Sequence, residues 1–277
     1  IMLPLDGMGV PFHIEPDVGP IVERPIRTAA DVQGLRVVEA EEATPYLFET
    51  IRGLRRDLAP EVALIGFGGG PFTLASYLIE GRPSRDLPRT KAMLLGEPET
   101  WSALMDVLVE VLVRYLRAQV AAGAQVIQLF DSWIGALAPD DYERSVLPHT
   151  RRIFEGLGAA VPRIHFGTGN PELLPLMARV PCEVVSVDWR IPLDEAWTRV
   201  GPDRGIQGNL DPGACLAPFE VTERYALDVL RRAGGRPGHV FNLGHGVLPE
   251  TDAGTLARLA ELVKLETARA PIAAAAL

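Results

Sequence analysis

Short apolar runs alternate with longer amphipathic segments along most of this chain. Six runs of four to six residues are rich in β-branched or aromatic side chains and are bounded by Gly, Pro, Asp or Asn. This pattern is typical of buried strands. The predicted strands are 62–67, 125–130, 163–166, 183–187, 205–208 and 239–243.

Apolar residues spaced at i, i+3, i+4 and i+7 predict helices between these strands. The spacing holds from Trp101 to Leu116, with Pro98 in the first turn and Gly123 just past the end. Further helices are predicted at 140–157, at 171–179 with Asn170 as N-cap, and at 193–200, 219–233 and 251–268. The Ala-rich tail 271–277 is predicted to fray.

The alternation of strand and helix predicts an α/β fold with a parallel sheet. An open doubly wound sheet and a (β/α)8 TIM-like barrel both fit, and the barrel is favoured because nearly every strand ends in polar or glycine-flanked residues. Six strands are too few to close a barrel, so we expect a segment ahead of Ile1 to be lacking from this chain. No linker divides residues 1–277, which predicts a single domain.

Composition, net charge and cysteine count exclude several classes of protein. The chain has 277 residues, 47% of them hydrophobic and 23% charged, which are ordinary globular values. A net charge of -9 argues against nucleic acid or an anionic membrane surface as partner, and no apolar run is long enough to span a membrane. Cys182 and Cys215 cannot form a disulfide framework, which favours a reducing cytoplasm.

Polar groups follow two of the predicted strands in the first half of the chain. The glycine-rich turn 66–70 lacks the spacing of a nucleotide-binding loop, so we interpret it as a tight turn with close backbone approach. Tyr77 follows it and either directs its hydroxyl into a site or packs with the hydroxyl at the surface. Asp131 and Ser132 either belong to a site or cap the next helix, and Ser132 lacks the G-x-S-x-G context of a hydrolase nucleophile.

His245 is the most suggestive single residue, because two flanking glycines leave its imidazole accessible just beyond a strand. Histidine transfers protons near neutral pH and binds carboxylates, which predicts a functional role. His165 lies inside an apolar run and is interpreted as a core histidine rather than a metal ligand. Asp188 and Arg190 either form a structural ion pair, which is slightly favoured, or contact substrate, and 209–212 is interpreted as turn chemistry.

Six motifs occur in order across nearly the whole chain. They are MLPLDGMG at 2–9, GFGGGPFTLASYLIEG at 66–81, QLFDSW at 128–133, VDWR at 187–190, QGNLDP at 207–212 and FNLGHG at 241–246. Together they resemble the uroporphyrinogen decarboxylases of haem biosynthesis. The resemblance implies a distorted (β/α)8 barrel, a cytoplasmic homodimer, and removal of CO2 from the four acetate arms of uroporphyrinogen to give coproporphyrinogen. It implies neither a metal nor an organic cofactor.

The resemblance also assigns residues. It implies that the hydroxyl of Tyr77 contacts substrate, that Ser132 and His245 bind substrate carboxylates, and that Phe130 lines the pocket. Tyr77 and His245 are the expected catalytic residues. The family's arginine motif is expected well ahead of Ile1 and its pyrrole-binding aspartate immediately ahead of it, so a chain truly truncated there is expected to have negligible activity.

Two other functions stay open. One is a zinc-dependent corrinoid methyltransferase of the same wider superfamily, whose zinc site would need a cysteine beside His165, where this chain has none. The other is a non-catalytic, truncated form that binds porphyrinogen without turnover.

Overall fold

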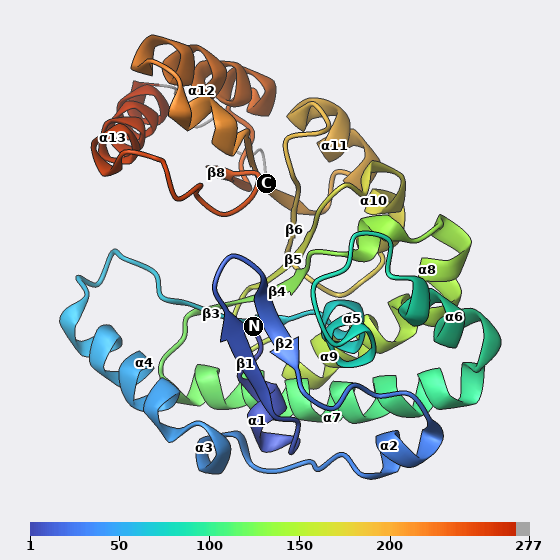
Figure 1. Ribbon diagram of the computed structural model, residues 1–277. Helices are drawn as coiled ribbons and strands as arrows, with labels where there is room; N and C mark the ends of the chain where they lie inside the picture. Colours follow the sequence, from blue (N-terminus) through green and yellow to red (C-terminus); the bar gives the residue numbers. More distant parts are fainter. Residues whose placement is uncertain (270–277) are drawn as a thin grey trace.

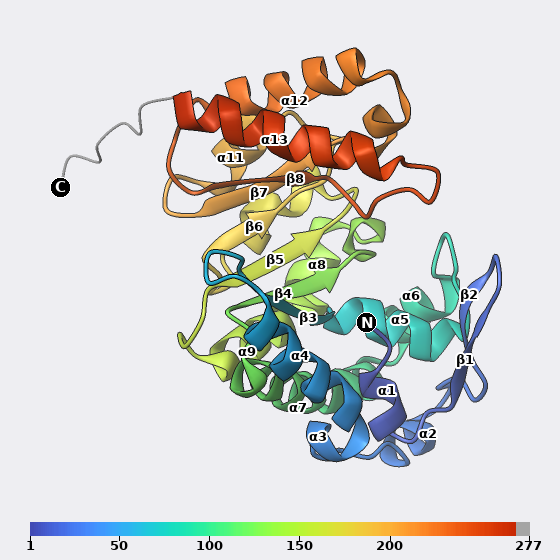
Figure 2. The ribbon, with the colours of Figure 1, turned by 90° about the vertical axis from the view of Figure 1, so that its left-hand side faces the viewer.

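Six parallel strands form the central sheet of the computed structural model, which describes residues 1–269. They are β3 (Ile65–Gly69), β4 (Val126–Asp131), β5 (Arg163–Gly167), β6 (Val184–Ser186), β7 (Gly205–Leu210) and β8 (His239–Leu243). Each strand pairs with the next one in sequence, as in a β/α barrel. Figures 1 and 2 show the strands side by side in this order, with helices along the outside. The predicted TIM-like α/β fold class is confirmed.

All six predicted strands are present, with small differences at their ends. The first begins at Ile65 rather than at Val62, because Val62 belongs to a turn in which its N–H donates to the Ala59 carbonyl. The strand predicted at 205–208 continues to Leu210, so Asn209 is a strand residue rather than part of a turn. Asp211 does make the expected turn, since its side chain accepts from the Gly213 N–H at 2.8 Å.

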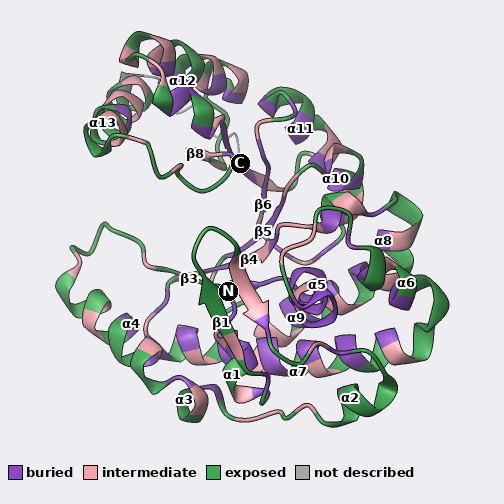
Figure 3. Ribbon diagram, in the orientation of Figure 1, coloured by how far each residue is buried: buried purple, intermediate pink, exposed green. Residues whose placement is uncertain are grey.

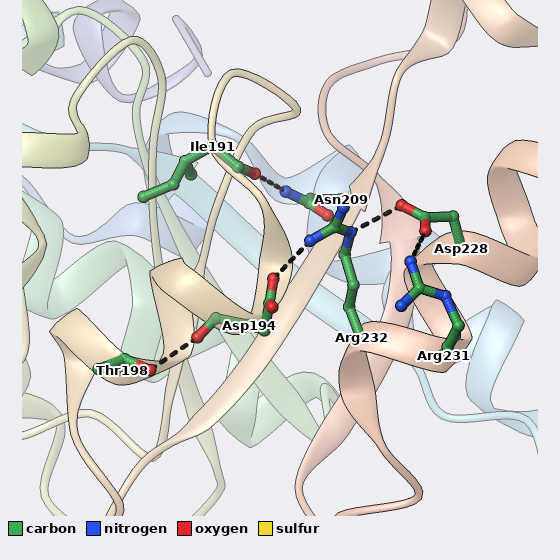
Figure 4. A network of polar contacts seen from close by, with 7 residues as sticks. All are labelled: Ile191, Asp194, Thr198, Asn209, Asp228, Arg231 and Arg232. Carbon is green, nitrogen blue, oxygen red and sulfur yellow. Dashed lines mark hydrogen bonds and ion pairs between the residues drawn. The ribbon is translucent and has the colours of Figure 1, made fainter.

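Helices cover the outer side of the sheet. The long helix α7 (Pro98–Ala122) ends at Gly123 in the left-handed conformation, as predicted, and packs against β3. The helices α11 (Leu193–Val200) and α12 (Phe219–Ala233) have the predicted bounds, and α13 (Ala253–Arg269) lies beside α12. Arg232 of α12 joins two neighbours: it donates to Asp228 on its own helix at 2.7 Å and to Asp194 on α11 at 2.9 Å (Figure 4).

Two predicted helices are interrupted, in each case near a proline inside the segment. The segment 140–157 forms α8 (Pro139–Ser145) and α9 (Leu147–Leu157), because Pro148 has no N–H to continue the first helix. The segment 171–179 forms a 3-10 turn at 171–173 and a short α10 (Leu174–Met177). Asn170 does not cap it; its side-chain amide donates to the Met177 sulfur at 2.7 Å.

The first third of the chain contains elements that the pattern analysis did not predict. They are α1 (Pro4–Gly7), an antiparallel hairpin of β1 (Phe12–Glu15) and β2 (Gly19–Val22), α2 (Ala29–Gln33), α3 (Ala40–Ala43), α4 (Pro45–Asp57), α5 (Pro71–Glu80) and α6 (Pro88–Gly96). The helices α2, α3 and α4 pack on α7, and β2 packs on α5. Figure 3 shows that α5 is buried along most of its length, whereas α4 has an exposed side.

Nearly all of the buried apolar residues form one connected cluster that runs from Met2 to Leu259; Ile164 and Phe166 of β5 are buried outside it. None of the helices in residues 1–269 is both long and apolar enough to cross a membrane. The fraying predicted for 271–277 lies outside the described residues.

Candidate active site

A cavity of about 430 Å³ opens at the carboxyl ends of β3, β4, β5 and β8. In a β/α barrel this end of the sheet carries the active site. Its walls come from strand interiors and from the loops that follow them. The cavity, called the main cavity below, is lined by Ile1, Phe67, Gln128, Phe130, Ser132, Phe166, Asn242, Leu243, His245, Gly246 and Val247.

Three phenylalanines form a continuous aromatic row along one wall of the main cavity. The ring centroids of Phe67 and Phe130 are 5.6 Å apart, and those of Phe130 and Phe166 are 5.3 Å apart. Parallel pairing places Phe130 directly beside Phe166, whereas Phe67 is in register with Gln128 and so lies diagonally from Phe130 on the same face of the sheet. The imidazole of His245 continues the row, with its centroid 6.1 Å from that of Phe166. The aromatic row (Phe67, Phe130, Phe166) therefore offers ring faces to a flat or cyclic ligand.

Ser132 follows β4 and enters the cavity from a fixed backbone position. The Thr168 hydroxyl donates to the Ser132 carbonyl oxygen at 2.6 Å, which ties the loop after β4 to the loop after β5. The Ser132 side chain makes no hydrogen bond within the described residues. Its hydroxyl is therefore available to a ligand.

Asp131 points the opposite way from its neighbour Ser132. Its Oδ1 accepts from the backbone N–H and the hydroxyl of Thr73, at 3.1 Å and 2.9 Å, and so caps the start of α5 rather than the helix after β4. Gly70 makes this possible, because a Cβ there would collide with the Asp131 side chain. Burial raises the pKa of Asp131 to about 7, while the two Thr73 hydrogen bonds oppose that shift. The side chain is part of the helix packing and not of the cavity.

The His245 loop is held by close backbone packing. The Gly244 N–H donates to the Leu210 carbonyl at 2.7 Å, and a Cβ at Gly244 would lie 2.6 Å from the Trp189 nitrogen. Only glycine fits at this approach, which explains one of the two glycines beside His245. His245 itself is exposed at the mouth of the cavity. Its predicted accessibility is therefore confirmed.

Tyr77 lies beside the main cavity but does not line it. Its ring packs against Trp133, the residue after Ser132, with centroids 4.3 Å apart. The hydroxyl makes no hydrogen bond within residues 1–269, and partial burial raises the pKa of Tyr77. The structure thus brings Phe130, Ser132 and His245 together, and places Tyr77 one side chain away.

Below the aromatic row, the inner side of the sheet is polar. The Gln207 amide donates to Gln128 Oε1 at 3.1 Å and to the Ser186 hydroxyl at 3.0 Å. All three side chains are buried. Gln128 also lines the cavity, so this small network supports its floor.

His165 occupies the other side of the sheet. Its ring packs against Phe154 of α9, with centroids 5.6 Å apart, and within residues 1–269 neither ring nitrogen has a hydrogen-bond partner. It is a core histidine as predicted, but an unsatisfied one, and burial lowers its pKa to about 3. The zinc-methyltransferase alternative would need this imidazole in the cavity, where it does not lie. Among residues 1–269 no three His, Cys, Asp or Glu side chains are grouped so as to hold a metal ion.

Sequence reasoning named Phe130 and missed Phe67, Phe166, Gln128 and Asn242 as lining residues. The position of Phe166 could have been predicted. The predicted strands 125–130 and 163–166 end at Phe130 and Phe166, so aligning the ends of these parallel strands places the two rings side by side. Asn242 lies three residues before His245 on β8, and strand alternation alone does not say on which side it falls.

Comparison with known proteins agrees with this geometry. The family model for uroporphyrinogen decarboxylase (URO-D) matches residues 1–265. The chain belongs to the uroporphyrinogen decarboxylase family. It is 50% identical to the uroporphyrinogen decarboxylase of Carboxydothermus hydrogenoformans over 264 residues, which covers 95% of this chain and 75% of that protein. The Thermobifida fusca uroporphyrinogen decarboxylase is 52% identical over 269 residues, covering 97% and 74%. The resemblance inferred from the motifs is confirmed, and the chain spans about three quarters of the length of these relatives.

Solved structures show the same fold at low identity. A methyltransferase from Methanosarcina mazei superposes with a TM-score of 0.82 at 20% identity, covering 96% of this chain and 78% of that one. A B12-independent methionine synthase from Shewanella sp. W3-18-1 gives a TM-score of 0.61 at 13% identity, covering 94% and 76%. Such likeness concerns the fold alone.

Proposed function

We propose that the main cavity binds uroporphyrinogen and that the protein removes CO2 from its four acetate arms, giving coproporphyrinogen in tetrapyrrole biosynthesis. The observation that carries this proposal is the family membership over residues 1–265, joined to a cavity at the carboxyl end of the sheet. Curated relatives named uroporphyrinogen decarboxylase, at 50% and 52% identity, support the same reaction.

The reaction needs an electron sink, and the substrate supplies one. Protonation of a pyrrole carbon beside an acetate arm makes the ring cationic. The bond between the arm's methylene and its carboxylate then breaks, CO2 leaves, and the electron pair enters the ring system. A proton added to the methylene carbon completes the methyl group, and the ring carbon then loses the proton it had gained, so each CO2 released consumes one proton. The protein has to hold the macrocycle, place the arm, and stabilise the positive charge while it exists.

The residues of the main cavity suit these tasks. The Ser132 hydroxyl and the His245 imidazole can each donate a hydrogen bond to a carboxylate arm. The aromatic row packs against the pyrrole rings and excludes water from them. Its negative ring faces also favour the cationic intermediate over the neutral substrate, which lowers the barrier.

Tyr77 has a separate part in the proposal. Its hydroxyl has no partner within the described residues, and its ring packs on Trp133 beside Ser132. We assign the hydroxyl to a substrate contact at the edge of the cavity. The ring additionally supports the loop that presents Ser132.

The first test is the turnover of uroporphyrinogen by variants of His245 and Tyr77. His245→Asn and Tyr77→Phe are each expected to cost about 1 to 3 kcal/mol in kcat/KM, as for the loss of a polar contact with a charged substrate. His13→Asn and Tyr46→Phe are matched controls at exposed positions away from the cavity and should leave kcat/KM unchanged. Unaltered kinetics in both His245→Asn and Tyr77→Phe would contradict the site. Tight binding of uroporphyrin by a wild-type protein that never releases CO2 would favour the non-catalytic alternative.

We also propose the cytoplasmic homodimer that the family resemblance implies. The argument for it is that resemblance alone. Sedimentation equilibrium of the purified protein at two concentrations measures the association state, and a mass equal to that of one chain at both would contradict the dimer.

A further inference from the structure

A second cavity, of about 280 Å³, lies beside the main cavity and shares one residue with it, Ser132. The loops after α5, β4, β5 and β6 form its walls. It is lined by Ser84, Arg85, Leu87, Ser132, Trp133, Gly135, Ala136, Thr168, Gly169 and Arg190. Two of these side chains are cationic and none is acidic. We call it the arginine cavity.

Arg190 is held in place before any ligand arrives. Its guanidinium Nη1 pairs with Asp188 Oδ2, and its Cζ lies over Trp189, 4.3 Å from the ring centroid. The 2%-exposed Asp188 side chain also accepts from the Gly169 N–H at 2.7 Å. The structural ion pair predicted from the sequence is therefore present, and it fixes the direction of Arg190.

The loop that carries Arg190 is anchored from β7. The side-chain amide of Asn209 donates to the Asp188 carbonyl at 2.9 Å and to the Ile191 carbonyl at 2.7 Å, so it clamps both ends of the loop (Figure 4 shows the second contact). One guanidinium hydrogen bond is used internally in the described part of the chain, which leaves further N–H donors of Arg190 for a ligand.

Arg85 lines the same cavity from a different loop. It lies in the loop between α5 and α6, where the Ser84 hydroxyl accepts from the Leu87 N–H at 3.2 Å. Its guanidinium is exposed and makes neither a hydrogen bond nor an ion pair within residues 1–269. An unpaired arginine and a second arginine in the lining of one small cavity, with no acidic lining residue, repel cations and favour an anion.

We propose that the arginine cavity binds a carboxylate arm of the same substrate whose reacting arm lies in the main cavity. This inference rests on the proposed function. A guanidinium presents paired N–H donors that match the two oxygens of a carboxylate, so the lining chemistry suits such an arm. Because the two cavities meet at Ser132, one macrocycle with several carboxylate arms can reach both. Arg85 and Arg190 then act as binding residues that set the orientation of the ring.

The test uses Arg85→Gln, Arg190→Gln and the double variant in the purified protein, with Arg82→Gln as control. Arg82 is an exposed arginine of the same loop outside the cavity, so it loses the same charge without losing a lining residue. We expect KM for uroporphyrinogen to rise about tenfold in Arg190→Gln and about threefold in Arg85→Gln, with kcat changed less than twofold. The control should keep the wild-type KM.

Two results separate this inference from the proposed function. A wild-type protein that does not decarboxylate uroporphyrinogen overturns the proposed function itself. A wild-type protein that does, together with a double variant whose KM matches that of the control, overturns the arginine cavity alone. A loss of kcat at unchanged KM also overturns it, because that pattern means a role in the chemical step rather than in holding a distant arm. Arg190→Gln also leaves the buried Asp188 carboxylate without its ion-pair partner, so urea unfolding of each variant is measured as well, and KM values are compared under conditions in which every variant is fully folded.

Discussion

The two faces of the central sheet differ in burial and polarity. On the outer face, Leu129, His165 and Val185 sit in register on neighbouring strands and are fully buried under the helices. On the inner face, Phe130 and Phe166 border a cavity, and a hydrogen-bonded amide network lies below them. The outer face therefore supplies most of the packing energy, and the inner face supplies the surface that a ligand meets.

The largest contrast is expected from the same substitution on the two faces. Phe154→Ala removes a fully buried ring from beneath the outer face and should lower the free energy of unfolding by about 3 to 5 kcal/mol. Phe67→Ala removes a ring that is 47% exposed on the inner face and should cost about 1 kcal/mol or less. Urea denaturation measures both, and equal losses would show that the faces do not differ.

Asp131 tests the burial of the outer face, because its carboxyl group lies on that face and can be titrated. Its pKa is raised from 3.8 to about 7 in the folded protein, so between these values the folded state holds a proton that the unfolded state has lost. Stability should then fall as pH rises from about 4 to about 7, by up to about 4 kcal/mol at 1.36 kcal/mol per pH unit. Asp131→Asn should flatten this part of the unfolding-versus-pH curve, whereas the exposed Asp203→Asn should not. An unchanged slope in the first variant contradicts the burial argument.

His165 gives a pH dependence of the opposite sign. Its folded pKa of about 3 lies below its ordinary value of 6.5, so the unfolded state takes up a proton first as the solution is acidified. Stability should be lost as pH falls through 6.5, by about 2 kcal/mol at pH 5. His165→Leu should remove that loss and also remove two unsatisfied ring nitrogens. His13→Leu, at an exposed histidine, should leave the acid slope as it is.

Helices and strands with regular apolar spacing are predicted well from the sequence, whereas the directions of single side chains are not. The helices α11 and α12 follow from apolar periodicity and boundary residues, whereas the division of α8 from α9 depends on the local effect of Pro148. The β1–β2 hairpin was not foreseen because its residues are mostly exposed and carry little apolar alternation.

In the site, too, some features follow from the sequence and others depend on the folded structure. Phe130, Ser132 and His245 were predicted and do meet at one cavity, because parallel strands end at the same edge. The opposite directions of Asp131 and Ser132 follow from the pleat and from the turn after β4, which sequence does not reveal. Arg190 was expected as a structural partner of Asp188, with a substrate contact as the alternative, and its place in a second cavity depends on folding of the loops between distant elements.

The packing of Gly244 on the backbone of Trp189 has a further consequence. This contact joins the loop that carries His245 to the loop that carries Arg190. The backbone positions of the two residues are therefore fixed relative to each other. A ligand that engages both must have carboxylates at a matching separation around its ring. The protein would thereby choose among polycarboxylates by the spacing of their arms as well as by their number.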